Sequence, residues 1–152
     1  MKKLAIVTIL LAFTWTASAA EAVKRDAPAA KKPGHTDQQI KAEFNRVSRS
    51  INNLDNNPAA LNAALAFIAK ETDVPVNLLR AQRNDHEGVG TAGIFLANEL
   101  AKYTKKPSRH WFEQHDNGKS WESLIEQAGF KWAQLMPKLE TMEKNMKAAA
   151  NK

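Results

Sequence analysis

The chain of 152 residues contains no cysteine. Disulfide scaffolds, thiolate zinc sites, cysteine nucleophiles and a lipoprotein-type N-terminal anchor are therefore excluded. Glycine and proline occur only six times each, and 25% of the residues are charged, which is close to the average for soluble globular domains. That composition excludes a collagen-like chain, wholesale disorder and a multipass membrane protein. The length suits about one domain, since domains usually have about 100–200 residues.

Long apolar runs are also lacking, and the run at the N-terminus is short. Leu4–Phe13 is a largely apolar stretch of ten residues, preceded by the basic Met1–Lys3 and followed by the small residues Ala17–Ala20. These three parts in this order are typical of a secretory signal peptide. The alternative, an uncleaved membrane anchor, is disfavoured because a bilayer-spanning helix needs roughly 20 apolar residues. We expect cleavage before Ala20 or Glu21, a periplasmic or secreted protein, and no stable membrane span afterwards.

The excess of positive charge is mild. Without Lys2 and Lys3 the chain has 20 Lys and Arg against 16 Asp and Glu, a net charge of +4. Such an excess favours anionic polymers or lipid headgroups as partners, although solubility alone would also explain it.

The segment after the expected cleavage site has little apolar surface. It holds two prolines and one sizeable apolar residue, Val23, so burial cannot offset the entropy of ordering it. We therefore expect a signal peptide over 1–20, a disordered leader over 21–35, a helical domain over 36–147 and a frayed tail over 148–152.

Alternation of apolar and polar residues, which marks half-buried strands, is lacking along the rest of the chain. Apolar residues instead recur every three or four positions, which indicates buried helix faces. Together with the cap residues, this spacing predicts an all-α fold, a compact bundle of about six or seven short helices with helix-turn-helix-like repeats. The helices are expected to begin at residues 36, 58, 75, 91, 107, 120 and about 131.

Several helix boundaries carry clear local patterns. Asn57 before Pro58 is typical of an N-cap followed by proline at the first helical position. Ser120 is expected to cap a helix that Gly129 ends. The segment 91–103 is almost wholly apolar and is the best candidate for the centre of the core.

The chain also contains an internal repeat. Ile68–Pro75 matches Leu100–Pro107 at an offset of 32 residues, and Leu124–Lys131 is a weaker third copy. Each copy reads as a helix, a polar turn and a second helix. DNA binding by such a unit is disfavoured, because export removes chromosomal DNA and the following helices lack a dense basic face. We expect no nucleic-acid partner.

Gly88, Gly90 and Gly93 form the pattern G-x-G-x-x-G. In a dinucleotide site these glycines follow a strand and open a helix. Here the preceding residues 83–87 are polar and end a helix, so we do not assign a cofactor site. We expect the glycines to allow a tight turn and close packing of the segment 91–103.

Titratable side chains gather in residues 110–116, and His86 lies in a distant loop. A metal site would draw on His86, His110, Glu113 and His115, since imidazole and carboxylate are common metal ligands. The pattern is weak, because His110 and His115 are five residues apart and do not share a helix face. The alternative interpretation is that these polar residues are solvated while their aromatic neighbours pack inward.

Three tryptophans, Trp111, Trp121 and Trp132, lie in the last third of the chain near basic residues. An exposed aromatic and basic surface would suit a glycan or an anionic polymer. The interaction surface on this hypothesis comprises Arg109, Trp111, Lys119 and Trp121. Core packing of short helices around large side chains is the more frequent explanation.

Ordered turns link several of these features. A Gly-x-Gly turn leads into an apolar helix with Ala-Asn within Glu87–Ala101, and a Gly-Lys-x-Trp turn precedes a short helix within Gly118–Ile125. Over residues 68–130 the chain resembles a group of small secreted bacterial helical proteins, from which it departs at Pro107–Trp111. The resemblance implies export and a helical fold, and no functional residues are carried over from it.

The sequence thus predicts an exported, non-enzymatic helical binding or interaction module of the cell envelope, with an envelope protein or an anionic polymer as its partner. The alternative is a periplasmic metal- or small-ligand-binding protein that uses the His/Glu cluster. A hydrolase of envelope polymers comes third, because no Ser–His–Asp spacing or carboxylate pair stands out. We assign no catalytic residue and no cofactor.

Overall fold

The computed structural model describes residues 37–152, and the predicted signal peptide, leader and Thr36 lie outside the described residues. The described part is all-α and contains no strand, which confirms the predicted fold class. Its seven helices are α1 (Asp37–Asn53), α2 (Pro58–Thr72), α3 (Val76–Asp85), α4 (Gly90–Thr104), α5 (Ser108–Asp116), α6 (Trp121–Ala128) and α7 (Trp132–Ala150).

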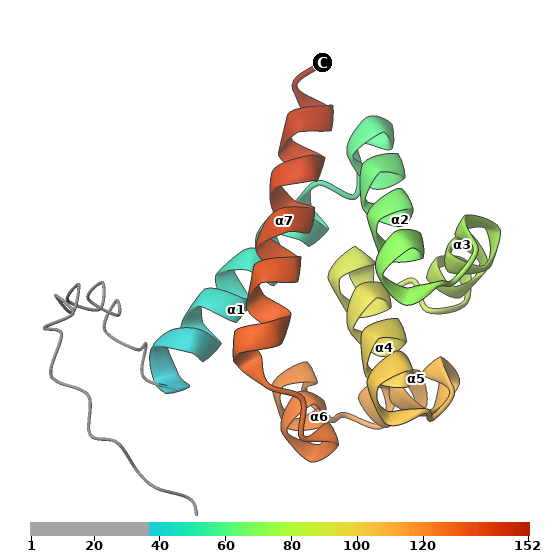
Figure 1. The fold of residues 1–152 in the computed structure, drawn as a ribbon. Coiled ribbons are helices and arrows are strands. Elements are labelled where there is room, and N and C mark those ends of the chain that lie inside the picture. The colour runs from blue at the N-terminus through green and yellow to red at the C-terminus, as the bar shows by residue number, and fades with distance from the viewer. Residues whose placement is uncertain (1–36) are drawn as a thin grey trace, which may run out of the picture. The chain divides into compact units, whose positions relative to one another are not determined.

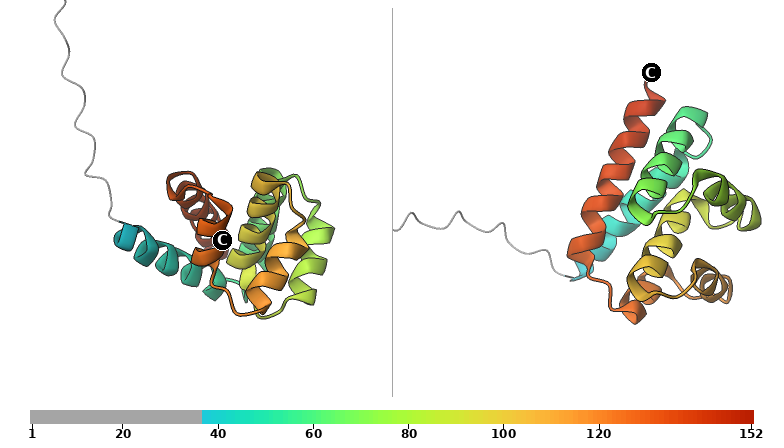
Figure 2. Two further views of the ribbon diagram at one scale, coloured as in Figure 1. Left: turned by 90° about the horizontal axis from the view of Figure 1, so that it is seen from below. Right: turned by 45° about the vertical axis from the view of Figure 1, so that its right-hand side comes forward.

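Helix α4 lies at the centre of the bundle. It packs against α1, α2, α3, α5 and α6, while the long C-terminal helix α7 packs along α1 and α2 (Figures 1 and 2). Ten consecutive residues of α4, from Thr91 to Leu100, are buried. The prediction that this segment forms the centre of the core is confirmed.

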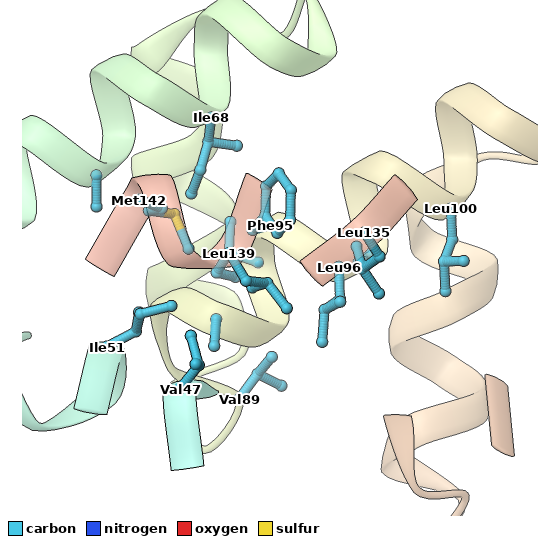
Figure 3. Close-up of a cluster of buried hydrophobic side chains, with 14 of the residues drawn as sticks. Val47, Ile51, Ile68, Val89, Phe95, Leu96, Leu100, Leu135, Leu139 and Met142 are labelled. Atoms are coloured by element: carbon cyan, nitrogen blue, oxygen red, sulfur yellow. The ribbon is translucent and has the colours of Figure 1, made fainter. Parts of the chain in front are cut away.

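The hydrophobic core joins helices that are distant in the sequence. Phe95 and Leu96 of α4 lie near Leu139 of α7, with Ile51 of α1 and Ile68 of α2 around them (Figure 3). All five side chains are at most 1% exposed. Burial of such side chains contributes about 1.5–3 kcal/mol each to the free energy of folding. The core is therefore the main favourable contribution to the stability of the bundle.

The predicted caps are confirmed. The Asn57 side chain accepts hydrogen bonds from the backbone N–H groups of Ala59 and Ala60, and Ser120 Oγ accepts one from Ser123. Gly129 ends α6 in the left-handed conformation. Helix α7 continues to Ala150, three residues beyond the expected end at 147, because these residues are alanines, the strongest helix formers.

The three copies of the internal repeat adopt the same turn. Each first helix ends at a residue with positive φ, and each second helix follows an extended residue two positions later. The left-handed residues are Asp73, Lys105 and Gly129, and the extended ones are Pro75, Pro107 and Lys131. The repeat is therefore a structural repeat of helix, turn and helix.

Two glycines of the pattern, Gly90 and Gly93, lie where an added Cβ would meet a neighbour, as expected for close packing, whereas Gly88 has no atom within 4 Å of such a Cβ. Gly90 has φ +67° and lies so close to α1 that an added Cβ would be 2.6 Å from Asn52 Cγ. Because the two segments are so close, Asn52 Oδ1 accepts a hydrogen bond from the Ala92 N–H at 3.0 Å. Asp55 Oδ2 accepts a second one from the Thr91 N–H, also at 3.0 Å. The end of α1 and the turn that follows it thus cap the N-terminus of α4, whose first N–H groups have no partner within their own helix.

Gly90→Ala should lower the free energy of unfolding by about 2–3 kcal/mol. A left-handed conformation costs a non-glycine residue about 1–2 kcal/mol, and a displaced cap costs about 1 kcal/mol more. Urea unfolding measures the change. Gly88→Ala is the matched control, because an added Cβ there meets no atom within 4 Å. Equal losses in both variants would contradict the capping account.

Candidate functional site

Two of the four predicted metal ligands lie in one hollow. His86 follows α3 and stacks on Phe112 with ring centroids 4.2 Å apart, and His115 in α5 stacks on Trp121 at 4.5 Å. Asp116 lies beside both, with oxygens 3.4 Å from His86 Nδ1 and 3.9 Å from His115 Nδ1. We call this the histidine pocket. Its volume is about 430 Å³, and its lining residues are Asp85, His86, Glu87, Gly88, Val89, His115 and Asp116.

The other two predicted ligands lie elsewhere. Glu113 accepts a hydrogen bond from Arg109 Nε at 2.8 Å, and His110 packs edge-on against Trp111 with its Nε2 buried. Neither residue lines the histidine pocket. In the described part of the chain, no group of three or more His, Asp or Glu side chains is arranged to hold a metal ion. The four residues therefore do not form one ligand set.

The prediction that Trp111 belongs to an exposed interaction surface is wrong. This side chain is 1% exposed and belongs to the core cluster. Trp121 is half-buried between Gly93 and His115, and Trp132 packs edge-on against Phe44. The alternative interpretation, in which large aromatic side chains anchor short helices, holds for Trp111.

The basic members of that predicted surface are exposed but engaged locally. The Arg109 side chain is 85% exposed and pairs with Glu113 one turn later on the same helix. Lys119 donates to Gln127 Oε1 at 3.0 Å. Without Trp111 the four predicted residues do not form an exposed aromatic and basic surface.

A second hollow lies between α1 and α7. Its volume is about 500 Å³, and three of its lining side chains are cationic. We call it the basic groove, and its lining residues are Arg46, Arg49, Ser50, Asn53, Leu54 and Lys147. Sequence reasoning missed it. Arg46 and Arg49 could be placed on the polar side of α1, but nothing in the sequence places Lys147, about 100 residues later, beside them.

A buried carboxylate fixes two of the three cations of the basic groove. The Glu143 side chain in α7 is 8% exposed, accepts a hydrogen bond from Arg46 Nη1 at 3.4 Å and pairs with Lys147. Burial alone would raise the pKa of Glu143, but hydrogen bonds from Lys147, Ser50 and Arg46 outweigh it and lower the pKa below its usual value. Glu143 is therefore ionised at neutral pH and orients both cations.

Glu143→Gln should lower the free energy of unfolding by about 1–3 kcal/mol near neutral pH, since hydrogen bonds to a charged group are lost. The native pKa is lowered, so this contribution is complete above the unfolded pKa and disappears as the pH falls through the folded pKa. Urea unfolding at neutral and at acidic pH measures it. Glu140→Gln, an exposed change on the same helix, should have little effect, and a loss that persists in acid would contradict the role of the carboxylate.

Comparison with known proteins found no matching family model, no matching curated protein and no matching solved structure. The resemblance to small secreted helical proteins stays a prediction from the sequence. Among residues 37–152, no helix is both long enough and apolar enough to cross a membrane.

Proposed function

We propose that the protein is an exported, non-enzymatic binding module of the cell envelope that holds an anionic polymer in the basic groove. The observation that carries the proposal is the convergence of Arg46, Arg49 and Lys147 on one hollow of about 500 Å³. Three cations around one concavity attract negative charge, because a concave low-dielectric surface focuses the electric field. The N-terminal sequence pattern supports export.

The cations differ in how they are engaged. Arg46 is bound by Glu43 at 2.7 Å and by Glu143, and Lys147 is bound by Glu143. Within residues 37–152, Arg49 donates only through Nε, to the Asn45 carbonyl at 3.1 Å. Its Nη groups, which have no acceptor among the described residues, are therefore the donors through which a ligand would be recognised. Guanidinium binds carboxylate and phosphate oxygens in pairs.

The shape of the groove supports a chain-like partner. Its lining residues on α1 run from Arg46 to Asn53, a rise of about 10 Å along a helix. Ser50 and Asn53 lie between the charged end and Leu54 and add neutral hydrogen-bonding groups. An extended polymer with anionic groups at intervals fits this stripe better than a single small ion does.

The test is the affinity of the mature protein for polyphosphate, measured by calorimetry at low salt. Arg49→Gln should weaken binding by at least about tenfold, because charge-assisted hydrogen bonds contribute about 1.5–3 kcal/mol and each 1.4 kcal/mol is a factor of ten. Arg80→Gln is the matched control, since Arg80 is exposed on α3 and donates to Asn62. Polyphosphate binding that is lost equally in both variants, or that is absent from the native protein, would contradict the proposal.

A second candidate function, binding of a metal ion or small ligand, is favoured by one observation in the histidine pocket. His86 Nδ1 lies 3.4 Å from an Asp116 carboxylate oxygen, whereas His115 Nδ1 lies 3.9 Å from the other oxygen, beyond hydrogen-bond distance. A carboxylate on one ring nitrogen commonly orients a histidine whose other nitrogen binds a metal. Added Zn²⁺ would then raise the melting temperature of the native protein, and His86→Ala would abolish the increase. An unchanged melting temperature at saturating Zn²⁺ would reject zinc binding.

A further inference from the structure

The turns of the internal repeat are brought together at the end of α4. Lys102 Nζ donates to the Glu71 carbonyl at 2.7 Å and to Asp73 at 2.8 Å, which ties the end of α4 to the end of α2. Tyr103 OH donates to the Gly129 carbonyl at 3.2 Å, which ties it to the end of α6. The α4–α5 and α6–α7 turns accordingly lie at the same end of the helical domain, at the bottom of Figure 1.

Three exposed lysines stand on these turns. Lys105 and Lys106 follow Tyr103 in the α4–α5 turn, and Lys131 follows Gly129 in the α6–α7 turn. None of the three forms an ion pair with a residue of the described part. By contrast, Lys102 is neutralised by Asp73. The end of α4 therefore carries a local excess of positive charge.

An exposed aromatic side chain lies among these lysines. Tyr103 is 47% exposed, although its ring packs edge-on against the buried Phe130 at 4.6 Å. Packing against Phe130 and the bond to Gly129 hold the ring at the surface. The Lys106 ammonium lies 5.5 Å from the ring centroid of Trp111, so it is also held close to the domain.

We infer that Tyr103, Lys105, Lys106 and Lys131 form a surface that binds anionic lipid headgroups, so that the domain attaches to the membrane from outside the bilayer. Lysines on long stems contribute roughly fivefold each to binding at an anionic lipid surface. Tyrosine is enriched where an apolar body meets a wet headgroup layer. This surface shares no residue with the basic groove, so the inference does not depend on the proposed function.

A flat lipid surface fits these side chains better than a polymer does. The three lysines lie in turns and Tyr103 lies at the end of α4, and neither the basic groove nor the histidine pocket includes any of the four. Lysine ammonium groups act as point charges without the paired donors that guanidinium offers to a single anion. A diffuse layer of negative charge requires no such pairing.

The test is sedimentation of the mature protein with vesicles of phosphatidylglycerol or of phosphatidylcholine. We expect binding to phosphatidylglycerol only, and about 25-fold weaker binding for Lys105→Gln/Lys106→Gln, at about fivefold per lysine. The matched control is Arg80→Gln/Lys144→Gln, which removes the same charge from exposed positions on α3 and α7. It should bind like the native protein, and circular dichroism should show both double variants folded.

Three results would overturn the inference. The first is equal binding to both lipids, and the second is equal weakening of vesicle binding in the two double variants. The third is that Lys105→Gln/Lys106→Gln binds vesicles like the native protein but loses polyphosphate binding. The last result would assign these lysines to a soluble polymer. Vesicle binding that survives Arg49→Gln would show that the two surfaces act separately.

Discussion

Replacing Lys138 by methionine is expected to lower the free energy of unfolding by about 3–5 kcal/mol. Lys138 in α7 pairs with Glu99 of α4, whose side chain is 5% exposed, and lies 3.3 Å from Glu71 of α2. The substitution would leave the buried Glu99 carboxyl without its cation. Removing one partner of a buried pair costs more than the pair itself contributes, because desolvation of the remaining charge is no longer offset.

The double variant Glu99→Leu/Lys138→Met should recover most of this loss, since an apolar pair of similar volume often matches a buried ion pair. Urea unfolding of the two single variants and the double variant measures the coupling. Lys144→Met, at an exposed position of the same helix, is the control and should change stability by less than about 0.5 kcal/mol. If Lys138→Met and Lys144→Met lowered the free energy of unfolding by similar amounts, the contact with Glu99 would not be the cause of the loss.

The pair should also persist at alkaline pH. Burial lowers the pKa of Lys138, but the hydrogen bonds and charges of Glu99 and Glu71 outweigh it and raise the pKa above its usual value. Because the pKa is raised in the folded state, the contribution of Lys138 to the free energy of unfolding is complete below the unfolded pKa. This contribution is lost as the pH rises through the folded pKa. The difference between the native protein and Lys138→Met should therefore shrink only in strong alkali.

Trp111→Ala should destabilise the fold by about 3–5 kcal/mol, the usual cost of removing a large aromatic side chain from a core. Trp111 is 1% exposed, and Phe112 beside it is equally buried. Thermal and urea unfolding measure the loss. Trp121→Ala is the comparison, because Trp121 is half-buried and should cost less. A loss below about 1 kcal/mol for Trp111→Ala would contradict its place in the core and return it to the predicted surface.

The predictable parts of the fold are those that depend on neighbours in the sequence. The caps at Asn57 and Ser120 form as their local patterns predict, since each bonds to backbone groups two or three residues later. The apolar stretch 91–100 is buried because no face of it is polar enough to meet water. The repeat predicts the turns at Asp73 and Lys105, although the positive φ of these two non-glycine residues is visible only in the structure.

The parts that the sequence does not predict depend on contacts between distant helices. The sequence groups His110 and Glu113 with His115 because the three are close in the chain, but His110 and Glu113 lie outside the histidine pocket. His86, which comes from a distant loop, lines that pocket with His115. Whether Trp111 faces water or the core depends on the packing of α5 on α4, which the pattern of α5 alone does not fix. The basic groove requires Lys147 to lie beside Arg46, a juxtaposition made by the packing of α7 on α1.

The most direct test of the central claim, that the basic groove holds an anionic polymer, is a titration of the mature protein with polyphosphate followed by backbone amide chemical shifts. The account predicts that the largest shifts cluster at Arg46, Arg49, Ser50 and Asn53 of α1 and at Lys147 of α7, and that they diminish in Arg49→Gln. Shifts centred on the histidine pocket, or spread evenly over all exposed lysines, would contradict it.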